Sequence, residues 1–595
     1  MMYNIKIQKD SFYKAFMNGA KAVINIEKTL NEINVFPVKD ADTGTNVRSL
    51  MESILQESKL KPTLKETLES ISLSALMGSK GNSGLIFSQF ISGFSKDIIH
   101  DYMDYQMLKE QIKKGYEFAY EAIEVPVEGT MITLMRQWYE LLNRESTGHI
   151  SFESYLMKVN QELQKSLEET KVLLPILKKH NVVDAGALAF TTFVDGFIKY
   201  LTNYQNVIDQ NSQHESIEIE DLAHDLTEND DIRFRYCTEV LIKTSLNKES
   251  IKSLMHHYGD SIVIGQSNEY YKIHLHTNEP EKVIEYLSMF AQIEHTKVDD
   301  MKQQYMMNHQ RKYDIAILTD SIADIEKKEI DSLQIHMFPV SIDFNGMIYY
   351  DKVSINNHMM LDLISKNKIF PKSASPSILS VKKQLETLTK FYKKIIVVTV
   401  SSQMSSTYNV FKNAIADMNS ENIKLIDSKQ NSISEGLIVH HAAHLISKGI
   451  EFNEIIKELE DVISKTSILV HVQTLDHMVR SGRVSKGLGV IAKVLNLKPI
   501  VSINSSGEGV VWSKALGKKR SFKKIVNEIK HIHRKEGIKS YAIAFVDNRK
   551  EAEKLKTELV KVLGFLPLYV TESSSVIAMN TGKNTVAVGY IKGEK

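Results

Sequence analysis

Two aspartates in one short loop are the first residues whose type and spacing indicate chemistry. Asp40 and Asp42 lie in the segment NVFPVKDADTGTNV, residues 34–47, where proline and glycine predict a loop. Residues two apart in an extended segment face one side, so this pair could bind a hard cation such as Mg²⁺. An Asp-rich turn with ordinary caps gives the same pattern. The loop adds further oxygens and phosphate donors at Thr43, Thr45 and Asn46.

Three more loops place glycines ahead of predicted helices. They are MGSKGNSGLIFSQF at 77–90, PVEGTMITLMR at 126–136 and HNVVDAGALAF at 180–190. Glycine permits close backbone approach, and a helix N-terminus attracts phosphate. Each glycine loop alone is weak evidence of a phosphate site.

In order and spacing, the four loops resemble the kinase module of the dihydroxyacetone-kinase L-subunit superfamily. More closely, they resemble the N-terminal domain of bacterial fatty acid kinase, over residues 1–204. The resemblance implies an all-α barrel of helices that holds ATP at one end. The nucleotide-binding residues that it implies in the three glycine loops are Asn82, Ser83, Gly84, Gly129, Thr130, Asp184 and Gly186. It also implies that Asp40 and Asp42 are the catalytic residues and hold Mg²⁺, with Asn34 near the position of a third ligand.

The motifs DADTGTN, KGNSG, VEGT and VDAG of these loops contain no histidine that could act as a general base. In phosphoryl transfer, the protein acts mainly by positioning the reactants and neutralising their charge. A carboxylate acceptor is already ionised at neutral pH and needs no base, whereas an alcohol acceptor would fit less well. The loops therefore favour an acyl-phosphate product.

A second candidate site is a trio of one cysteine and two histidines between residues 233 and 305. Cys237 lies on one predicted strand, and His274 and His276 lie on another, two residues apart and so on one face. One thiolate and two imidazoles could form a Zn²⁺ site, although a buried cysteine beside strand histidines gives the same pattern. The two segments also resemble the middle domain of fatty acid kinase, where such a trio recurs and binds metal.

Residues 313–595 alternate strands such as YDIAILTDS and IIVVTVSS with helical segments, which predicts a mostly parallel sheet. The motifs FPVSIDFNG, VSSQMSSTYN, IDSKQNSISEG and MNTGKNTVAVGY resemble the DegV family of fatty-acid-binding proteins. That resemblance implies two α/β lobes with an acyl chain between them. Ordinary turn and cap chemistry would also explain the hydroxyl clusters. The implied fatty-acid-binding residues are Asp320, Ser321, Ser373, Ser405, Thr407, Arg483, Asn580 and Thr581.

Length and composition limit the alternatives. The 595 residues suggest three or four domains, and the formal net charge of +1 argues against a nucleic-acid partner. A single cysteine excludes an internal disulfide and indicates a reducing compartment. No secretory signal or membrane-spanning stretch is evident, so we expect a cytoplasmic protein. The basic run at 514–535 is typical of a solvated helix face, and an anionic surface such as a membrane is the alternative.

The predicted fold class is therefore multidomain. It comprises an all-α helical-barrel kinase domain (1–204), an acidic linker (205–232), a small α/β middle domain (233–305) and a two-lobed α/β DegV-like domain (313–595).

The predicted function is ATP- and Mg²⁺-dependent phosphorylation of a long-chain fatty acid, giving acyl-phosphate for phospholipid synthesis. Expected partners are a second copy of the chain in a homodimer and a downstream acyltransferase or a peripheral membrane contact. Two alternatives are a lipid-binding or transfer protein with a nucleotide-sensing domain, and a kinase of another small molecule such as a dihydroxyacetone-like ketone.

Overall fold

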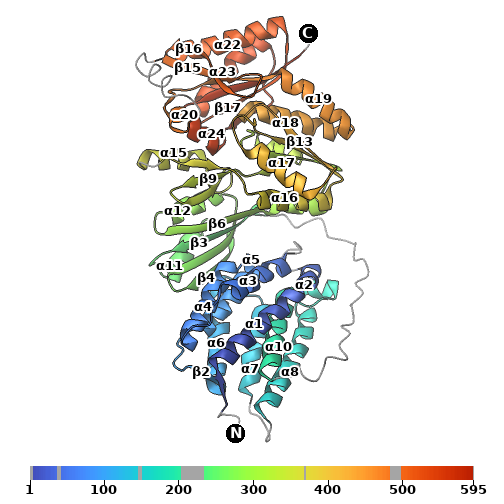
Figure 1. Ribbon diagram of the computed structural model, residues 1–595, viewed down its shortest axis with the longest axis vertical. Coiled ribbons are helices and arrows are strands. Elements are labelled where there is room, and N and C mark those ends of the chain that lie inside the picture. The colour runs from blue at the N-terminus through green and yellow to red at the C-terminus, as the bar shows by residue number, and fades with distance from the viewer. Residues whose placement is uncertain are drawn as a thin grey trace. The chain divides into compact units, whose positions relative to one another are not determined.

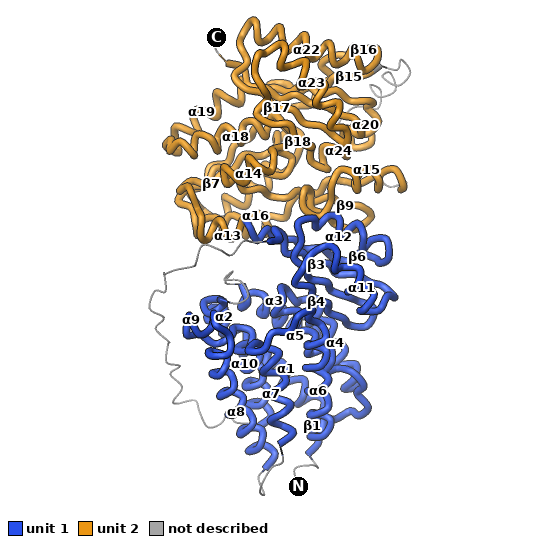
Figure 2. The backbone as a smooth tube through the Cα atoms, turned by 180° about the vertical axis from the view of Figure 1, so that it is seen from behind, with its two compact units in different colours: residues 1–302 blue, residues 303–595 orange. Residues whose placement is uncertain are grey.

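The computed structural model describes residues 5–35, 42–144, 151–202, 233–367, 370–482 and 497–593. The chain divides into two compact units, residues 1–302 and 303–595 (Figure 2). The expected acidic linker at 205–232 lies outside the described residues, as do Asp40 and Arg483. Among the described residues, no helix is both long and apolar enough to cross a membrane.

The first part of unit 1 is helical (Figure 1). Its apolar faces meet in one core, in which Phe90 packs edge-on against Phe190 with ring centroids 5.1 Å apart. Several helices begin at capping side chains, as where Thr63 and Glu66 form a reciprocal capping box. The helices are α1 (Lys9–Asn25), α2 (Glu27–Glu32), α3 (Thr43–Glu57), α4 (Leu64–Gly78), α5 (Gly81–Phe94), α6 (Tyr105–Ala122), α7 (Met131–Asn143), α8 (Phe152–Leu173), α9 (Pro175–His180) and α10 (Ala185–Leu201).

The helical part is not purely helical. Strands β1 (Lys6–Gln8) and β2 (Tyr102–Asp104) pair antiparallel and bring together segments about one hundred residues apart. Each has only three residues, too few for the alternation of apolar and polar side chains to identify a strand in the sequence.

The rest of unit 1 is an antiparallel sheet of order β4-β5-β3-β6 with two short helices. Its strands are β3 (Tyr236–Lys243), β4 (Asp260–Ser267), β5 (Tyr270–Thr277) and β6 (Gln292–Asp300), and its helices are α11 (Lys248–Met255) and α12 (Pro280–Leu287). The alternating patterns around Cys237 and His274 predicted strands β3 and β5. Helix α13 (Met301–His309) follows the sheet.

The first lobe of unit 2 has a parallel sheet of order β13-β12-β7-β8, as predicted. A small antiparallel sheet of order β10-β9-β11 lies in the same half of the unit. The elements are β7 (Ile315–Asp320), α14 (Lys327–Ser332), β8 (His336–Phe338), β9 (Ser341–Phe344), β10 (Met347–Tyr350), α15 (Asn357–Lys366), β11 (Lys372–Ala374), α16 (Ile378–Phe391), β12 (Lys394–Thr399), α17 (Thr407–Met418) and β13 (Ile423–Asp427).

The second lobe has a six-stranded sheet of order β16-β15-β14-β19-β17-β18. Here the expectation of a mostly parallel sheet is wrong, because only β17 and β18 pair in parallel. Strands β15 and β16 are joined by a short turn, which requires antiparallel pairing. The elements are α18 (Ser432–Ser447), α19 (Phe452–Lys465), β14 (Thr466–His471), α20 (Asp476–Arg480), β15 (Leu497–Ile503), β16 (Gly509–Leu516), α22 (Lys518–Lys535), β17 (Ile538–Phe545), α23 (Arg549–Leu563), β18 (Val570–Glu572), α24 (Ser575–Thr581) and β19 (Val586–Lys592).

Two helices of unit 2 illustrate opposite environments. Helix α18 is buried on nearly all sides, and its apolar side chains share one core with strands of both lobes. Helix α22 carries the basic run and buries Ile525, Ile529 and Ile532 on one face. Lys519, Arg520, Lys523 and Lys524 are exposed.

Candidate functional site

The first two predicted loops meet at the N-termini of α3 and α5. Gly81 has φ +58°, and a Cβ atom there would lie 2.5 Å from Nδ2 of Asn46. Only a residue without a side chain allows this approach. Asp42 occupies the N-cap position of α3 without capping it through its side chain, and Asn34 is 3% exposed. The structure therefore brings Asn46 and the glycine loop together.

The α5 N-terminus has features that fit a nucleotide with its cation. The side-chain oxygen Oδ1 of Asn82 is buried, has no hydrogen-bond partner among the described residues, and can accept from an N–H or O–H group of a ligand or bind a cation. The first-turn amides of a helix have no intrahelical acceptor and favour anions. Carboxylate and amide oxygens such as those of Asp42 and Asn34 suit Mg²⁺. These residues, with Ser83 and Gly84 in the same turn, would hold a nucleotide and its cation.

Thr45 has a structural use that the sequence did not indicate. Its amide donates to Oδ1 of Asn31 at 3.1 Å, and its hydroxyl donates to Glu27 at 3.3 Å. Arg48 forms an ion pair with Glu27 at 2.5 Å. Thr45 therefore anchors α3 to α2, while Thr43 and Asn46 are buried nearby.

The other two predicted loops meet at the N-termini of α7 and α10, where Gly186 lies against Met131. The Gly129 amide donates to Thr133 at 2.9 Å, and the Thr130 hydroxyl donates to the carbonyl of Val127 at 2.8 Å.

Asp184 caps α10 with its side chain. It accepts from the Ala187 amide at 2.7 Å, and burial raises the pKa of the carboxyl to about 6. This side chain therefore stabilises the start of α10, and its contact with a nucleotide remains a prediction.

Cys237, His274 and His276 come together on β3 and β5. Sγ of Cys237 lies 3.7 Å from Nδ1 of His274, and one donor atom from each residue lies within 4.8 Å of the others. Sulfur and nitrogen ligands around tetrahedral zinc are separated by about 3.5 Å, as bond lengths near 2.3 and 2.0 Å require. The arrangement fits Zn²⁺ with a fourth position left for another ligand.

Burial shifts the pKa of the Cys237 thiol and that of the His276 imidazole in opposite directions. Burial raises the pKa of the Cys237 thiol well above its usual range, and the carboxylates of Glu239, Asp299 and Asp42 raise it further. Burial lowers the pKa of His276 to about 3, so that imidazole is neutral and can act as a ligand at neutral pH. A cation would be needed to hold the thiolate form.

Unit 2 contains two adjoining cavities. One, of about 390 Å³, is lined by hydroxyl and amide side chains, and among its described lining residues none is charged. The other, of about 580 Å³, is mostly apolar, with Ile468, Val470 and Ala587 in its wall. Both volumes lie in the range of about 300–1,000 Å³ that is typical of small-molecule sites. The residues shared by the two walls are Met404, Asn431, Met478, Ile577 and Thr581.

The predicted fatty-acid-binding residues divide into two groups. Ser373, Ser405, Asn580 and Thr581 line the polar cavity. Thr407, Asp320 and Ser321 are buried and do not belong to the described cavity walls.

The three buried residues stabilise the wall of the polar cavity. The hydroxyl groups of Thr407 and Ser405 form a hydrogen bond of 2.9 Å. Asp320 accepts from the amides of Val400 at 2.9 Å and Ile322 at 3.0 Å, both of which belong to lining residues. Asp320 and Ser321 thus bind other groups of the protein, and their contact with a fatty acid remains a prediction.

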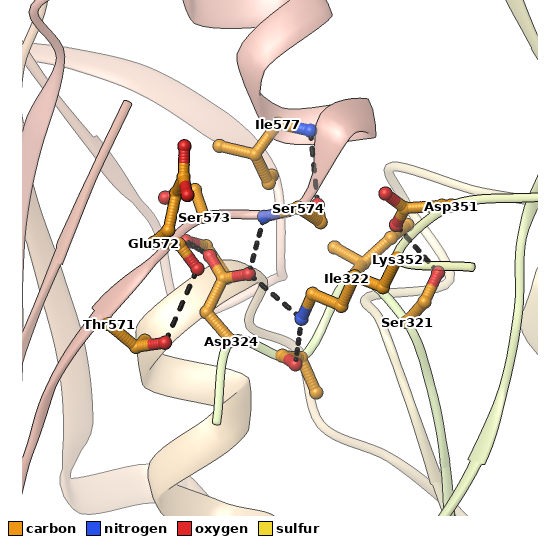
Figure 3. Close-up of polar contacts among 12 residues, drawn as sticks. Ser321, Ile322, Asp324, Asp351, Lys352, Thr571, Glu572, Ser573, Ser574 and Ile577 are labelled. Carbon is orange, nitrogen blue, oxygen red and sulfur yellow. Dashed lines mark hydrogen bonds and ion pairs between the residues drawn. The ribbon is translucent and has the colours of Figure 1, made fainter. Parts of the chain in front are cut away.

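A buried polar network fixes the start of α24, the helix that carries Asn580 and Thr581 (Figure 3). Asp324 accepts from the Ser574 amide at 2.7 Å and pairs with Lys352 at 3.2 Å. Asp351 accepts from the Ser575 amide and from the Ser321 hydroxyl, each at 2.7 Å. Burial raises the pKa of Asp351 to about 6.

The wall residues Met404, Asn431 and Met478 were not predicted as site residues. They lie in three separate motifs of the sequence, VSSQMSSTYN, IDSKQNSISEG and LDHMVRSGRVSK, and only folding brings them to one cavity. Asn431 donates to Sδ of Met404 at 3.5 Å, which orients that flexible side chain between the two cavities.

Family models match three successive parts of the chain. The DAK2 domain matches residues 37–199, the FakA-like middle domain of fatty acid kinase matches residues 233–308, and the uncharacterised DegV family matches residues 314–593. The chain therefore combines a kinase-type DAK2 domain and a DegV domain. Between them it carries a middle domain of the fatty acid kinase type, which confirms the resemblance drawn from the motifs.

The chain is also similar to individual proteins. An uncharacterized protein of Staphylococcus saprophyticus is 31% identical over 314 residues, which are 50% of this chain and 56% of the relative. One of Staphylococcus haemolyticus is 30% identical over 314 residues, with the same shares. The chain thus spans about half the length of these curated relatives.

Solved structures match the DegV part. A fatty-acid-binding DegV family protein of Thermus thermophilus is 21% identical with a TM-score of 0.44, over 47% of this chain and 99% of that one. DegV of Bacillus subtilis, described as a fatty acid binding protein, is 25% identical with a TM-score of 0.43, over 47% and 100%.

Proposed function

We propose that this chain is a fatty acid kinase that carries its own acyl-binding part. The observation that supports the proposal most is the succession of a DAK2 domain, a fatty acid kinase-type middle domain and a DegV domain whose fold contains adjoining apolar and polar cavities. The acyl chain would occupy the apolar cavity and its carboxylate the polar one.

The reaction transfers one phosphoryl group. A carboxylate oxygen of the fatty acid bonds to the γ-phosphorus of ATP, the bond to the β–γ bridging oxygen breaks, and ADP leaves with that electron pair. The glycine loops and α5 would bind and orient the phosphates. Mg²⁺, held by Asp42 with Asn34 and Asp40, would supply neutralisation of developing charge. No proton has to be removed, because the acceptor is already ionised.

Serine hydroxyls and asparagine amides in the polar cavity can donate hydrogen bonds to a carboxylate. The described lining of this cavity would therefore contribute neutral hydrogen-bond donors to the carboxylate. Covalent linkage of the two parts raises the effective concentration of the acyl-binding part near the kinase to the millimolar range for a reachable linker.

The test incubates the purified chain with ATP, Mg²⁺ and oleate and traps acyl-phosphate as the hydroxamate. We expect product from the wild type and from Glu57→Ala, an exposed change at the far end of α3, but none from Asp40→Ala, Asp42→Ala. A chain that contains bound fatty acid and never forms hydroxamate would instead be a lipid-binding protein with a nucleotide-sensing domain. Phosphorylation of dihydroxyacetone would identify a ketone kinase.

A further inference from the structure

Two charged side chains of the middle domain lie against the glycine loop of the helical part, within unit 1. Oε1 of Glu239, on β3, accepts from the backbone amide of Gly81 at 2.6 Å. Nζ of Lys272, on β5, donates to the backbone carbonyl of Ser79. The two middle-domain residues thus bind the backbone on both sides of Lys80.

Glu239 and Lys272 also form a buried ion pair. Oε2 of Glu239 lies 3.6 Å from Nζ of Lys272, and their side chains are 4% and 9% exposed. A buried charge is costly unless it is paired and hydrogen-bonded, so each needs both its partner and its backbone contact. A shift of the loop backbone would therefore remove one hydrogen bond from each member of this buried pair.

Further contacts join the two parts around this pair. The backbone amide of Gln266, on β4, donates to Oε1 of Gln89 at 2.9 Å, and Ser92 donates to the Gln266 carbonyl at 2.6 Å. Both contacts join β4 to α5. A small apolar cluster packs beside them and consists of Leu76, Leu85, Ala122, Leu241 and Val263.

We propose that Glu239 and Lys272 are positioning residues of the nucleotide site, which the helical part and the middle domain build together. This inference rests on the proposed use of the glycine loop for phosphate. The carboxylate takes the first free amide of α5, and Lys272 neutralises it. The following amides and the unpartnered Oδ1 of Asn82 are left to a ligand.

Nucleotide affinity and loop exchange in the full chain test the proposal. The Glu239→Gln, Lys272→Met double variant removes both charges together and keeps similar volume, which avoids a lone buried charge. We expect the Kd for fluorescent ADP with Mg²⁺ to rise about tenfold or more, the loss typical of charge-assisted hydrogen bonds. Hydrogen exchange should accelerate at residues 79–84 but not in α10.

The matched control removes a more exposed pair of the same sheet, between the end of β3 and the turn that precedes β5. Lys243, on β3, pairs with Glu269 at 2.8 Å, so Lys243→Met, Glu269→Gln makes the same chemical changes away from the loop. It should bind ADP like the wild type. A double variant at Glu239 and Lys272 with wild-type affinity and loop exchange would overturn the proposal. So would equal acceleration of exchange throughout the helices, which would show a merely structural role.

The results distinguish failure of this inference from failure of the proposed function. If the wild type binds ADP and the double variant does not, yet no acyl-phosphate forms, the positioning role stands and the fatty acid kinase activity fails. If the wild type binds no ADP, both fail.

Discussion

Asp320 binds the backbone of a cavity wall. Its carboxylate accepts two backbone amides of residues that line the polar cavity, and burial raises its pKa to about 6. Asp184 does the same for α10. A sequence motif identifies residues that a site needs. Only the hydrogen-bond partners in the structure show whether such a side chain faces the ligand or the protein backbone.

Glu435 gives a prediction at this scale because both its carboxylate oxygens are buried without a partner among the described residues. Burial, with Asp320 and Asp324 nearby, raises its pKa well above the model-compound value of 4.5. The folded chain keeps a proton that the unfolded chain releases above that value. This contribution to stability is therefore full below pH 4.5 and is lost as pH rises, by at most about 1.4 kcal/mol per pH unit.

Glu435→Gln removes this dependence. In thermal unfolding, the stability of the variant relative to the wild type should increase steadily from pH 5 to pH 8. Exposed Glu421→Gln should show no such trend. A constant difference between the Glu435 variant and the wild type across this range would contradict the argument.

Cys237 gives the second residue-scale prediction. Because the thiol is one of three donors, Cys237→Ser should reduce bound zinc from about one ion per chain to nearly none. Elemental analysis of protein purified without chelator measures this. His256→Ala, at a half-exposed histidine outside the trio, should retain zinc. Undiminished zinc in the Cys237 variant would exclude the trio as the site.

Helix N-termini organise the candidate kinase site at the element scale. Helices α3 and α5 meet at Asn46 and Gly81, and α7 and α10 meet at Met131 and Gly186. Each pair comes from loops far apart in the chain. The loops were predicted from glycine and aspartate, but which N-termini pair with which depends on how the helices pack.

Gly81→Ala tests the element scale. A Cβ would lie 2.5 Å from Asn46 and the residue has positive φ, so the loop should distort and ADP affinity should fall at least about tenfold. Gly346→Ala is the control. That glycine has φ +85° but nothing within 4 Å, so only backbone strain of about 1–2 kcal/mol is expected. Calorimetric titration with ADP and thermal unfolding distinguish the two, and unchanged affinity in Gly81→Ala would remove the loop from the nucleotide site.

At the scale of the whole molecule, two compact units occupy one chain, and each contains one half of the proposed reaction. The nucleotide features belong to residues 1–302 and the acyl cavities to residues 303–595. Changes that affect one half should therefore leave ligand binding by the other intact.

Ala587→Trp tests this independence. The new side chain would fill part of the apolar cavity, so mass spectrometry of lipid extracts should find several-fold less bound fatty acid. ADP affinity should stay unchanged. Tryptophan at Leu566, which is 68% exposed, is the control and should retain the lipid. Full lipid content in the Ala587 variant would place the acyl chain elsewhere.

The sequence by itself determined the order of the three parts, most of their helices and strands, and the Cys237 trio, because these depend on local periodicity and spacing. Because side chains alternate along a strand, Glu239 shares a face with Cys237 and Lys272 shares a face with His274, so the sequence did indicate that these charges lie near the trio. Their contact with the glycine loop was decided by tertiary structure alone. Only packing of β3 and β5 against α5 brings those charges to Gly81, and only pairing across the sheet makes the last lobe antiparallel. Contacts between distant segments depend on burial and hydrogen bonding in three dimensions, which local pattern does not record.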